Sequence, residues 1–434
     1  MKVIIGSSIG ALVFADLLSR SEEIIWVKRP GKVGGLFGGI DSGSGILDIG
    51  MTNLELGSLQ QKTDDRELES YSRERTNDCL HHLGTVRSYL YQYSDLVQLP
   101  EPQMLYQDEL LPDFFYGHRL DILNKFDFDY SEVLKRLAAI PSNLHPSLKY
   151  QVSSALNDVS YLKLCRDIYG EGFVNSILIP WMSKLGVKDL ATISAIDHRI
   201  IWAPLYYPES IERAITEGIV DLGFRASFSK PTESSLSVLI DQIAQIITSR
   251  PNVQIHTIDA LTDEVIQQYS MCSTSDEIII ADRIPNALLS ANQTKIDLLY
   301  FKTESRRVEF NYVVNSCNQE MPWYRISKNM NLLEGEIMLC AEYPSNSIKD
   351  LTSPHELGIG KYVDTDHFHI EKKLTCISAL NLPDRDWDNS YQRLVQKLIE
   401  SNKNIKLLGP SVGRWKNTFS DQVIQAHKLA KELN

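Results

Sequence analysis

A short turn near the amino terminus has the residue types and spacing that bind the phosphate groups of nucleotide cofactors. Residues 6–11, GSSIGA, lie between an apolar run at 2–5 and a stretch of helical spacing at 10–20. They fit the pattern G-x-G-x-x-[GA], with serine in place of the second glycine. This pattern allows a tight turn and a close approach of the backbone to a pyrophosphate, and the helix N-terminus supplies N–H donors. The candidate cofactor-binding residues of the turn are Gly6, Ser8, Ile9, Gly10 and Ala11.

Two basic residues follow the next predicted strand. Residues 23–27 are mostly apolar and rich in β-branched side chains, so residues 2–27 are predicted to form a strand, a turn, a helix and a second strand. Units of this kind place an acid after the second strand, because a carboxylate accepts hydrogen bonds from the ribose hydroxyls. Lys28 and Arg29 stand there instead, and a lysine can only donate. A cation at this position suits the 2′-phosphate of NADP.

Further features of the chain resemble a known family. Gly34 and Gly35 form a pair shortly after the basic residues, and LDIG follows at 47–50. FAD enzymes of the amine oxidase, protoporphyrinogen oxidase and UDP-galactopyranose mutase group are similar, with an acid, a basic residue, a Gly-Gly pair and a later D-x-G. In this resemblance Lys28 takes the place of the ribose-binding glutamate. Other segments similar to this group lie at 169–200, 276–289, 321–331, 339–344 and 407–433.

The resemblance implies an α/β fold with two domains. The first is a Rossmann-like FAD-binding domain assembled from separated segments, and the second is a substrate domain of helices plus a mixed β-sheet. We assign residues 1–90, 226–292 and 386–434 to the first, and 91–225 and 293–385 to the second. Residue patterns predict helices within 62–93 and at 131–140, 148–157, 161–169, 234–248, 387–401 and 421–433. They predict strands at 253–257, 277–281, 308–314, 337–342 and 374–377.

The resemblance also implies cofactor contacts near the carboxyl terminus. A helix is predicted to begin near Asp421, and the N–H groups at its start would face the flavin ring and stabilise negative charge on it. The family has an arginine after the glycine that matches Gly409, whereas this chain has Pro410. An alternative alignment uses Arg414. The implied cofactor-binding residues are Gly409, Gly413, Arg414 and Asp421, with Gly34, Gly35 and Val253, in addition to Lys28, Arg29 and the turn.

Four residues of the implied substrate domain are candidates for binding a substrate. A guanidinium offers a planar fork of donors to a carboxylate or a diphosphate, and the resemblance points to Arg199 and Arg325. Lys184 stands where the mutase-like pattern has its lysine, and Tyr324 would wall a pocket that faces the flavin. The structural alternatives are an ion pair between elements for the arginines and core packing for the tyrosine.

Three interpretations of the cofactor site remain open. FAD binds, either more weakly or with a neighbouring acid such as Glu22 or Glu23 replacing the missing acid; another nucleotide such as NADP binds; or the site is degenerate and binds no cofactor. The resemblance implies a flavin-dependent oxidoreductase that acts on a small anionic substrate by hydride transfer. The alternatives are a UDP-galactopyranose mutase-like isomerase of a nucleotide sugar and a non-catalytic protein. No residue is assigned as the catalytic base.

Composition excludes other classes of function. The formal net charge of −12 argues against binding nucleic acid or an anionic membrane surface. The six cysteines form no CxxC pair, which indicates reduced thiols. His367 and His369 alternate along a predicted strand without a third ligand, so no metal site is expected. Because no apolar stretch reaches the roughly 18 residues of a membrane helix, we expect a cytoplasmic protein without a membrane span.

Overall fold

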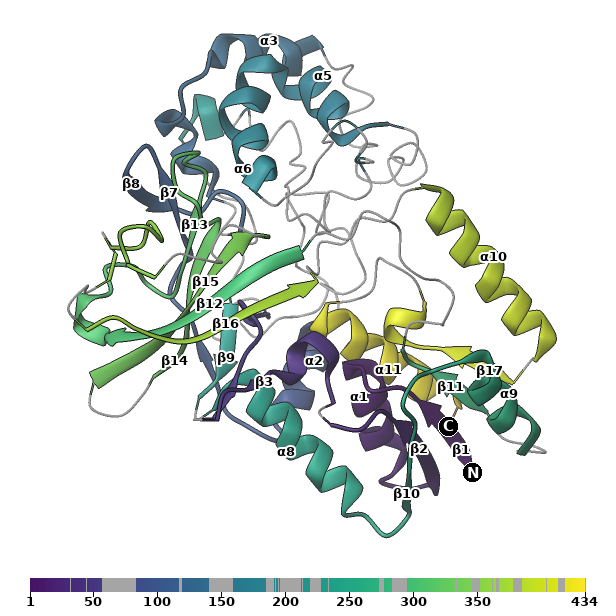
Figure 1. Cartoon of the computed structure of the whole chain (residues 1–434). Coiled ribbons are helices and arrows are strands. Elements are labelled where there is room, and N and C mark those ends of the chain that lie inside the picture. Colours follow the sequence, from purple (N-terminus) through teal and green to yellow (C-terminus); the bar gives the residue numbers. More distant parts are fainter. Residues whose placement is uncertain are drawn as a thin grey trace.

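The computed structural model of the chain shows two β-sheets with helices around them (Figure 1). The structure describes residues 1–31, 33–43, 45–56, 83–116, 119–139, 159–184, 191, 193, 195, 212, 214–218, 228–232, 234–272, 277–282, 295–331, 335–345, 352–360, 362–363, 367–377, 385–402, 404–412 and 418–433.

A parallel sheet lies beside the two chain termini. Its strand order is β10-β2-β1-β11-β17, so segments from both ends and the middle of the sequence lie side by side. All four neighbouring pairs are parallel. The strands are β1 (Lys2–Ile5), β2 (Ile24–Lys28), β10 (Val253–Thr257), β11 (Ile278–Ile280) and β17 (Ile405–Leu407). Because β1 and β11 are short runs of apolar residues buried between helices, they have the composition of central strands in a parallel sheet.

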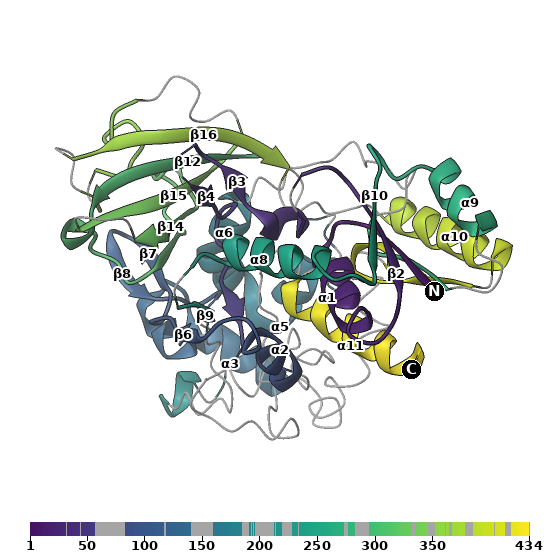
Figure 2. The same ribbon diagram turned by 90° about the horizontal axis from the view of Figure 1, so that it is seen from below.

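Helices cover both faces of this sheet. On one face α1 (Ile9–Leu18) packs against α8 (Leu236–Thr248) and α11 (Phe419–Leu433). On the other face a separate apolar cluster joins the sheet to α9 (Asp263–Cys272) and α10 (Arg385–Ser401). The view in Figure 2 shows α8 extending from the region of β10 toward the second sheet. The predicted α/β fold with a Rossmann-like sheet is therefore confirmed.

The second sheet is mixed and has seven strands in the order β16-β12-β15-β14-β13-β7-β8. Its neighbouring pairs are antiparallel except for β13 with β7. The strands are β7 (Gln103–Tyr106), β8 (Glu109–Pro112), β12 (Lys295–Glu304), β13 (Val313–Ser316), β14 (Arg325–Asn331), β15 (Glu336–Pro344) and β16 (His369–Ile377). This is the mixed sheet expected for the substrate domain, although the strand predicted at 308–314 begins only at Val313.

Further helices and smaller sheets lie outside these two sheets. The helices are α2 (Leu83–Leu90), α3 (Tyr130–Ala139), α5 (Tyr161–Phe173) and α6 (Ile179–Lys184), with a π-helical turn at Val174–Leu178. Strands β5 (Leu54–Glu55), β9 (Phe228–Pro231) and β6 (Leu96–Gln98) form a three-stranded sheet, and β3 (Ile40–Asp41) pairs with β4 (Ile46–Leu47). The helices predicted at 62–82 and 148–157 lie outside the described residues, and the domain boundaries remain predictions.

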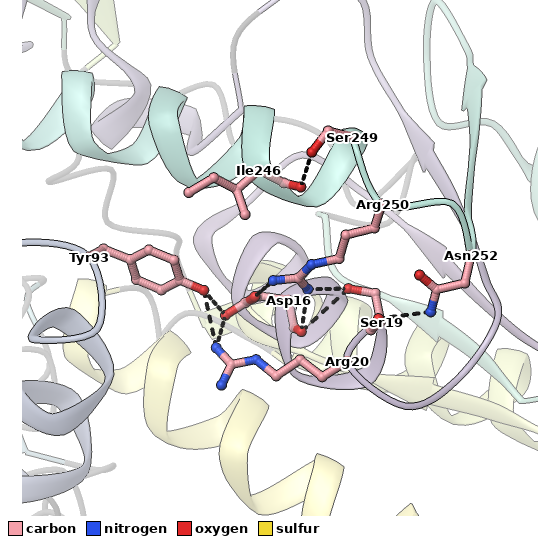
Figure 3. A network of polar contacts seen from close by, with 8 residues as sticks. All are labelled: Asp16, Ser19, Arg20, Tyr93, Ile246, Ser249, Arg250 and Asn252. Atoms are coloured by element: carbon pink, nitrogen blue, oxygen red, sulfur yellow. Dashed lines mark hydrogen bonds and ion pairs between the residues drawn. The ribbon is translucent and has the colours of Figure 1, made fainter.

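A buried carboxylate ties α1 to the segments around it (Figure 3). Asp16 is fully buried and accepts hydrogen bonds from Arg20 and Arg250, each at 2.7 Å. The hydroxyl of Tyr93 donates to the same carboxylate at 2.6 Å. Burial, followed by the hydrogen bond to Asp16, raises the pKa of Tyr93 to about 12. Because this network joins α1 to the chain that follows α2 and α8, it fixes the helix that begins at the glycine-bearing turn.

Candidate functional site

The glycine-bearing turn joins the end of β1 to the start of α1. Gly6 has φ +144°, and a Cβ atom there would lie 2.9 Å from the backbone nitrogen of Asp282, so no side chain fits. Ser8 caps the helix, because its hydroxyl accepts the N–H of Ala11 at 3.2 Å. The same hydroxyl donates to the carbonyl of Ala281 at 2.5 Å. Serine at this position therefore binds the turn to the end of β11.

The N–H groups of the turn have different partners. The N–H of Ser7 donates to the carboxylate of Asp282 at 3.0 Å, and the N–H of Gly10 donates to the side-chain oxygen of Gln422 at 3.0 Å. Ile9 is fully buried, and no described residue accepts a hydrogen bond from its N–H. A helix N-terminus with an unpaired N–H group is the usual place for a phosphate oxygen.

Asp282 is a site residue that sequence reasoning missed. It follows β11, so it lies at the carboxyl edge of the parallel sheet beside the turn, and it is 8% exposed. Its carboxylate also pairs with the guanidinium of Arg29 at 3.3 Å, and the backbone N–H of Arg29 donates to the hydroxyl of Ser7 at 3.0 Å. Burial raises the pKa of Asp282 despite its hydrogen bond with Ser7 and the charge of Arg29. An acid directly after a predicted strand was the signal in the sequence.

Lys28 is the last residue of β2 and the Cα partner of Thr257. The resemblance places the residue that contacts the ribose at this end of the strand. Lys28 is partly buried, and no described residue pairs with its side chain. Glu22 and Glu23 precede β2, at the opposite end of a five-residue strand and therefore about 16 Å away. Glu22 pairs with Lys2 at 3.1 Å. The hypothesis that one of these acids replaces the missing glutamate is therefore wrong on geometry.

Val253 also lies away from the turn. It is the Cα partner of Ile24 at the start of β2, whereas Gly6 follows the end of β1. Val253 lies four residue steps before Thr257 on this strand, which corresponds to about 13 Å. The structure therefore does not bring Val253 to the glycine-bearing turn.

Gly34 and Gly35 differ in their surroundings. The N–H of Gly34 donates to the carbonyl of Ser7 at 2.6 Å, and a Cβ atom at Gly34 would lie 3.0 Å from Ile240. Gly34 has φ +104°, which a residue with a side chain rarely adopts. Gly35 has φ +60°, and a Cβ atom there would meet nothing within 4 Å. Gly34 therefore packs against the turn, whereas Gly35 borders open space.

The segment at the carboxyl terminus reaches the same turn. Gly409 has φ +60° and lies against Gln422, the residue that accepts the N–H of Gly10. Asp421 lies in the first turn of α11, where its carboxylate accepts the hydroxyl of Thr418 at 2.7 Å. Its charge is favourable at a helix start. The predicted contacts Gly413 and Arg414 lie outside the described residues.

In the mixed sheet, Arg325 and Tyr324 meet the buried carboxylate of Glu342. Arg325 donates to both oxygens of Glu342 at 2.6 Å, and the Tyr324 hydroxyl donates to it at 2.6 Å. A further N–H of Arg325 donates to Tyr116 at 2.5 Å. Burial opposes the charge of Arg325, but Glu342 and Tyr116 outweigh it and raise the pKa of the guanidinium. Two of its five N–H groups have no acceptor among the described residues.

This ion pair lies next to the D-x-G segment at 48–50. Glu342 accepts the N–H of Met51 at 3.2 Å, and a Cβ atom at Gly50 would lie 3.1 Å from its carboxylate. The N–H of Gly50 donates to the Tyr300 hydroxyl at 3.2 Å, while Asp48 accepts the N–H of Ser237 at 2.9 Å. The structure therefore brings 48–50 and Arg325 to one place around Glu342.

Lys184 lies apart from the Arg325–Glu342 ion pair, and each of its N–H donors has an acceptor within the protein. Lys184 is 6% exposed, and its ammonium group donates to the hydroxyl of Ser316 and to the carbonyls of Met321 and Trp323, at 3.2, 2.7 and 3.1 Å. These three bonds use all of its N–H groups. Burial lowers the pKa of Lys184 to about 8. Lys184 therefore connects α6 to the loop between β13 and β14. Arg199 lies outside the described residues.

Other chemistry has little support in the described part of the chain. No group of three or more His, Cys, Asp or Glu side chains there could hold a metal ion. Cys165, Cys317, Cys340 and Cys376 form no disulfide. None of the described helices is both long enough and apolar enough to cross a membrane.

Comparisons with solved structures place this architecture in a class. The chain has the fold of the flavoprotein group that its sequence resembles. A reduced UDP-galactopyranose mutase aligns with 99% of this chain and 93% of its own, at 14% identity and a TM-score of 0.64. A putative protoporphyrinogen oxidase from Exiguobacterium sp. 255-15 aligns over 99% and 98%, at 14% identity and a TM-score of 0.55. A putrescine oxidase bound to putrescine aligns over 99% and 98%, at 10% identity and a TM-score of 0.55.

Sequence comparisons give no closer assignment. No family model matches the chain, and no curated protein matches it. Likeness at these identities establishes the fold alone.

Proposed function

We propose that the chain binds FAD at the carboxyl edge of the parallel sheet and acts as a flavin-dependent oxidoreductase. The buried N–H of Ile9, unpaired among the described residues, carries this proposal. It lies at the first turn of a helix that follows a tight glycine turn, which is the geometry that receives a diphosphate in nucleotide-binding folds.

The residues present fit such a cofactor in most respects. Gly6 keeps the turn tight, and the open space at Gly35 leaves room beside it. Two residues oppose the fit. Lys28 offers no acceptor to a ribose, and the carboxylate of Asp282 lies where a phosphate would bind. The fit of the backbone therefore supports a nucleotide, and these two side chains tune its affinity.

A bound flavin would accept a hydride, and with it two electrons, from a C–H bond of the substrate. The residues of this chain would orient that substrate. Glu342 and Tyr116 hold the guanidinium of Arg325, and its two N–H groups without an acceptor among the described residues would donate to a carboxylate of the substrate. No described residue hydrogen-bonds the buried hydroxyl of Tyr312, whose pKa is raised by burial and, to a smaller extent, by Asp113. A small anionic substrate suits these donors.

The visible absorbance spectrum of the purified protein tests this proposal. We expect a flavin band, either directly or after incubation with FAD and removal of unbound cofactor. Colourless protein whose unfolding temperature does not rise with FAD would contradict it. A rise with NADPH alone would favour the phosphorylated nicotinamide, which the two basic residues Lys28 and Arg29 also suit.

A further inference from the structure

A carboxylate of the chain occupies the anion position of the glycine-bearing turn. Asp282 accepts the N–H of Ser7 at 3.0 Å, and its interaction with the N–H of Ser8 also favours the charged form. A Cβ atom at Gly6 would lie 3.1 Å from the carboxyl carbon of Asp282, so the carboxylate lies directly on the turn. The hydrogen bond from a backbone N–H of the turn to this carboxylate is the contact that a phosphate oxygen makes at such a turn.

Arg29 holds this carboxylate from the other side of the turn. Its guanidinium lies 3.3 Å from Asp282 and is 53% exposed, so it reaches the turn from the solvent side. Its backbone N–H donates to the hydroxyl of Ser7 at 3.0 Å, which fixes the start of the side chain at the turn. A cation that is anchored here and partly exposed can change partner from a carboxylate to a phosphate without a change in the backbone.

We propose that Asp282 is an internal competitor for the diphosphate of the nucleotide, and that Arg29 becomes a diphosphate ligand when Asp282 is displaced. This inference rests on the proposed nucleotide-binding function and names the two side chains that set its affinity. A diphosphate beside an ionised Asp282 would be repelled, since both anions would compete for the N–H of Ser7 and for one guanidinium. Nucleotide binding therefore requires the carboxylate to leave the turn or to take up a proton.

Binding titrations of the full chain test the inference. The probes are FAD and ADP, because both carry a diphosphate, and binding is followed by calorimetry and by the quenching of flavin fluorescence. Asp282→Asn removes the charge but keeps an oxygen for the N–H of Ser7, and we expect it to tighten the binding of both probes by about tenfold. Asp167→Asn is the matched control, since it removes one exposed carboxylate, which pairs with Lys163 on α5.

Arg29→Gln separates the two parts of the inference. In the background of Asp282→Asn, we expect Arg29→Gln to weaken ADP binding by about tenfold, because the guanidinium then has only the diphosphate as its partner. If Arg29 served Asp282 alone, the second substitution would leave the affinity unchanged, and the role of Arg29 would be refuted. Asp282→Ser replaces Asp282→Asn if that variant does not fold.

The outcomes distinguish this inference from the proposed function. If the wild type binds FAD or ADP and Asp282→Asn binds no more tightly, competition by Asp282 is wrong while nucleotide binding stands. If folded wild type and folded Asp282→Asn both fail to bind FAD, ADP and NADPH, the nucleotide function is wrong and the inference falls with it.

Discussion

Arg325 and Glu342 are Cα partners on the adjacent strands β14 and β15, and their side chains form a two-bonded ion pair within the mixed sheet. The pair is nearly closed to solvent, with side-chain exposures of 13% and 1%. Removing one member of a buried pair leaves an uncompensated charge, which costs about 3–5 kcal/mol, whereas removing both members costs far less.

We therefore expect Arg325→Met and Glu342→Gln each to lower the free energy of unfolding by about 3–5 kcal/mol. The double variant should lose much less than the sum of the two. Denaturant unfolding of the four proteins measures the coupling energy. Additive losses would show that the two side chains act independently of each other.

The residue at the end of β2 should select the nucleotide. Lys28→Glu introduces an acceptor for ribose hydroxyls, and one charge-assisted hydrogen bond is worth about 1.5–3 kcal/mol, so FAD should bind about tenfold more tightly. The same change should abolish the binding of NADPH, because a carboxylate repels its 2′-phosphate. Titration of both cofactors against both proteins gives opposite signs for the two ligands. If neither affinity changes, Lys28 does not contact the nucleotide.

The buried ammonium of Lys184 should make stability depend on alkaline pH. Burial lowers its pKa from 10.5 to about 8, so between these values the unfolded chain binds more protons than the folded chain. Stability from this group should therefore rise from about pH 8 toward pH 10.5, by about 3 kcal/mol in total. Lys184→Met should be less stable because three acceptors lose their donor, and it should lack this rise. Unfolding curves measured across this range against the wild type supply the test.

The carboxylate of Asp16 should be important for the stability of the region around the parallel sheet. Asp16→Ala leaves Arg20 and Arg250 without their shared anion, and we expect a loss of about 3–5 kcal/mol. Tyr93→Phe removes one donor to Asp16 and should cost about 1 kcal/mol. Thermal unfolding monitored by circular dichroism compares the two variants. Equal losses would show that the arginines contribute nothing through Asp16.

An oxidoreductase and an isomerase can be distinguished by whether the reaction consumes an electron acceptor. An oxidoreductase should consume an electron acceptor in proportion to the substrate converted, and oxygen uptake with an amine or a saturated substrate would show this directly. A mutase-like isomerase should instead act on a nucleotide sugar only after its flavin is reduced, and should consume no acceptor. Assays with reduced and oxidised protein on both substrate classes distinguish the two.

Local patterns in the sequence were sufficient to predict the strands and the helix next to the glycine-bearing turn. The helix predicted at 10–20 and the strands predicted around it follow from apolar spacing, and the structure confirms them as Ile9–Leu18, Lys2–Ile5 and Ile24–Lys28. The partners of these elements could not be predicted in the same way. Ser7 and Asp282 are separated by 275 positions, so their contact depends on β11 lying beside β1, which no local pattern specifies. Arg325 and Glu342 likewise meet only through the register of two strands.

The strand order of the parallel sheet has a consequence for biosynthesis. On the ribosome, β1 and β2 are made first, yet β1 gains its second neighbour only when β11 emerges, and β11 in turn waits for β17. Gln422, which accepts the N–H of Gly10, is made later still. The strands β12, β14 and β15 can instead pair soon after they are made, because they are close in sequence. The apolar surface of α1 that packs against α11 therefore lacks its partner until α11 has been made, and transiently exposed apolar surface of this kind makes a nascent chain prone to aggregation.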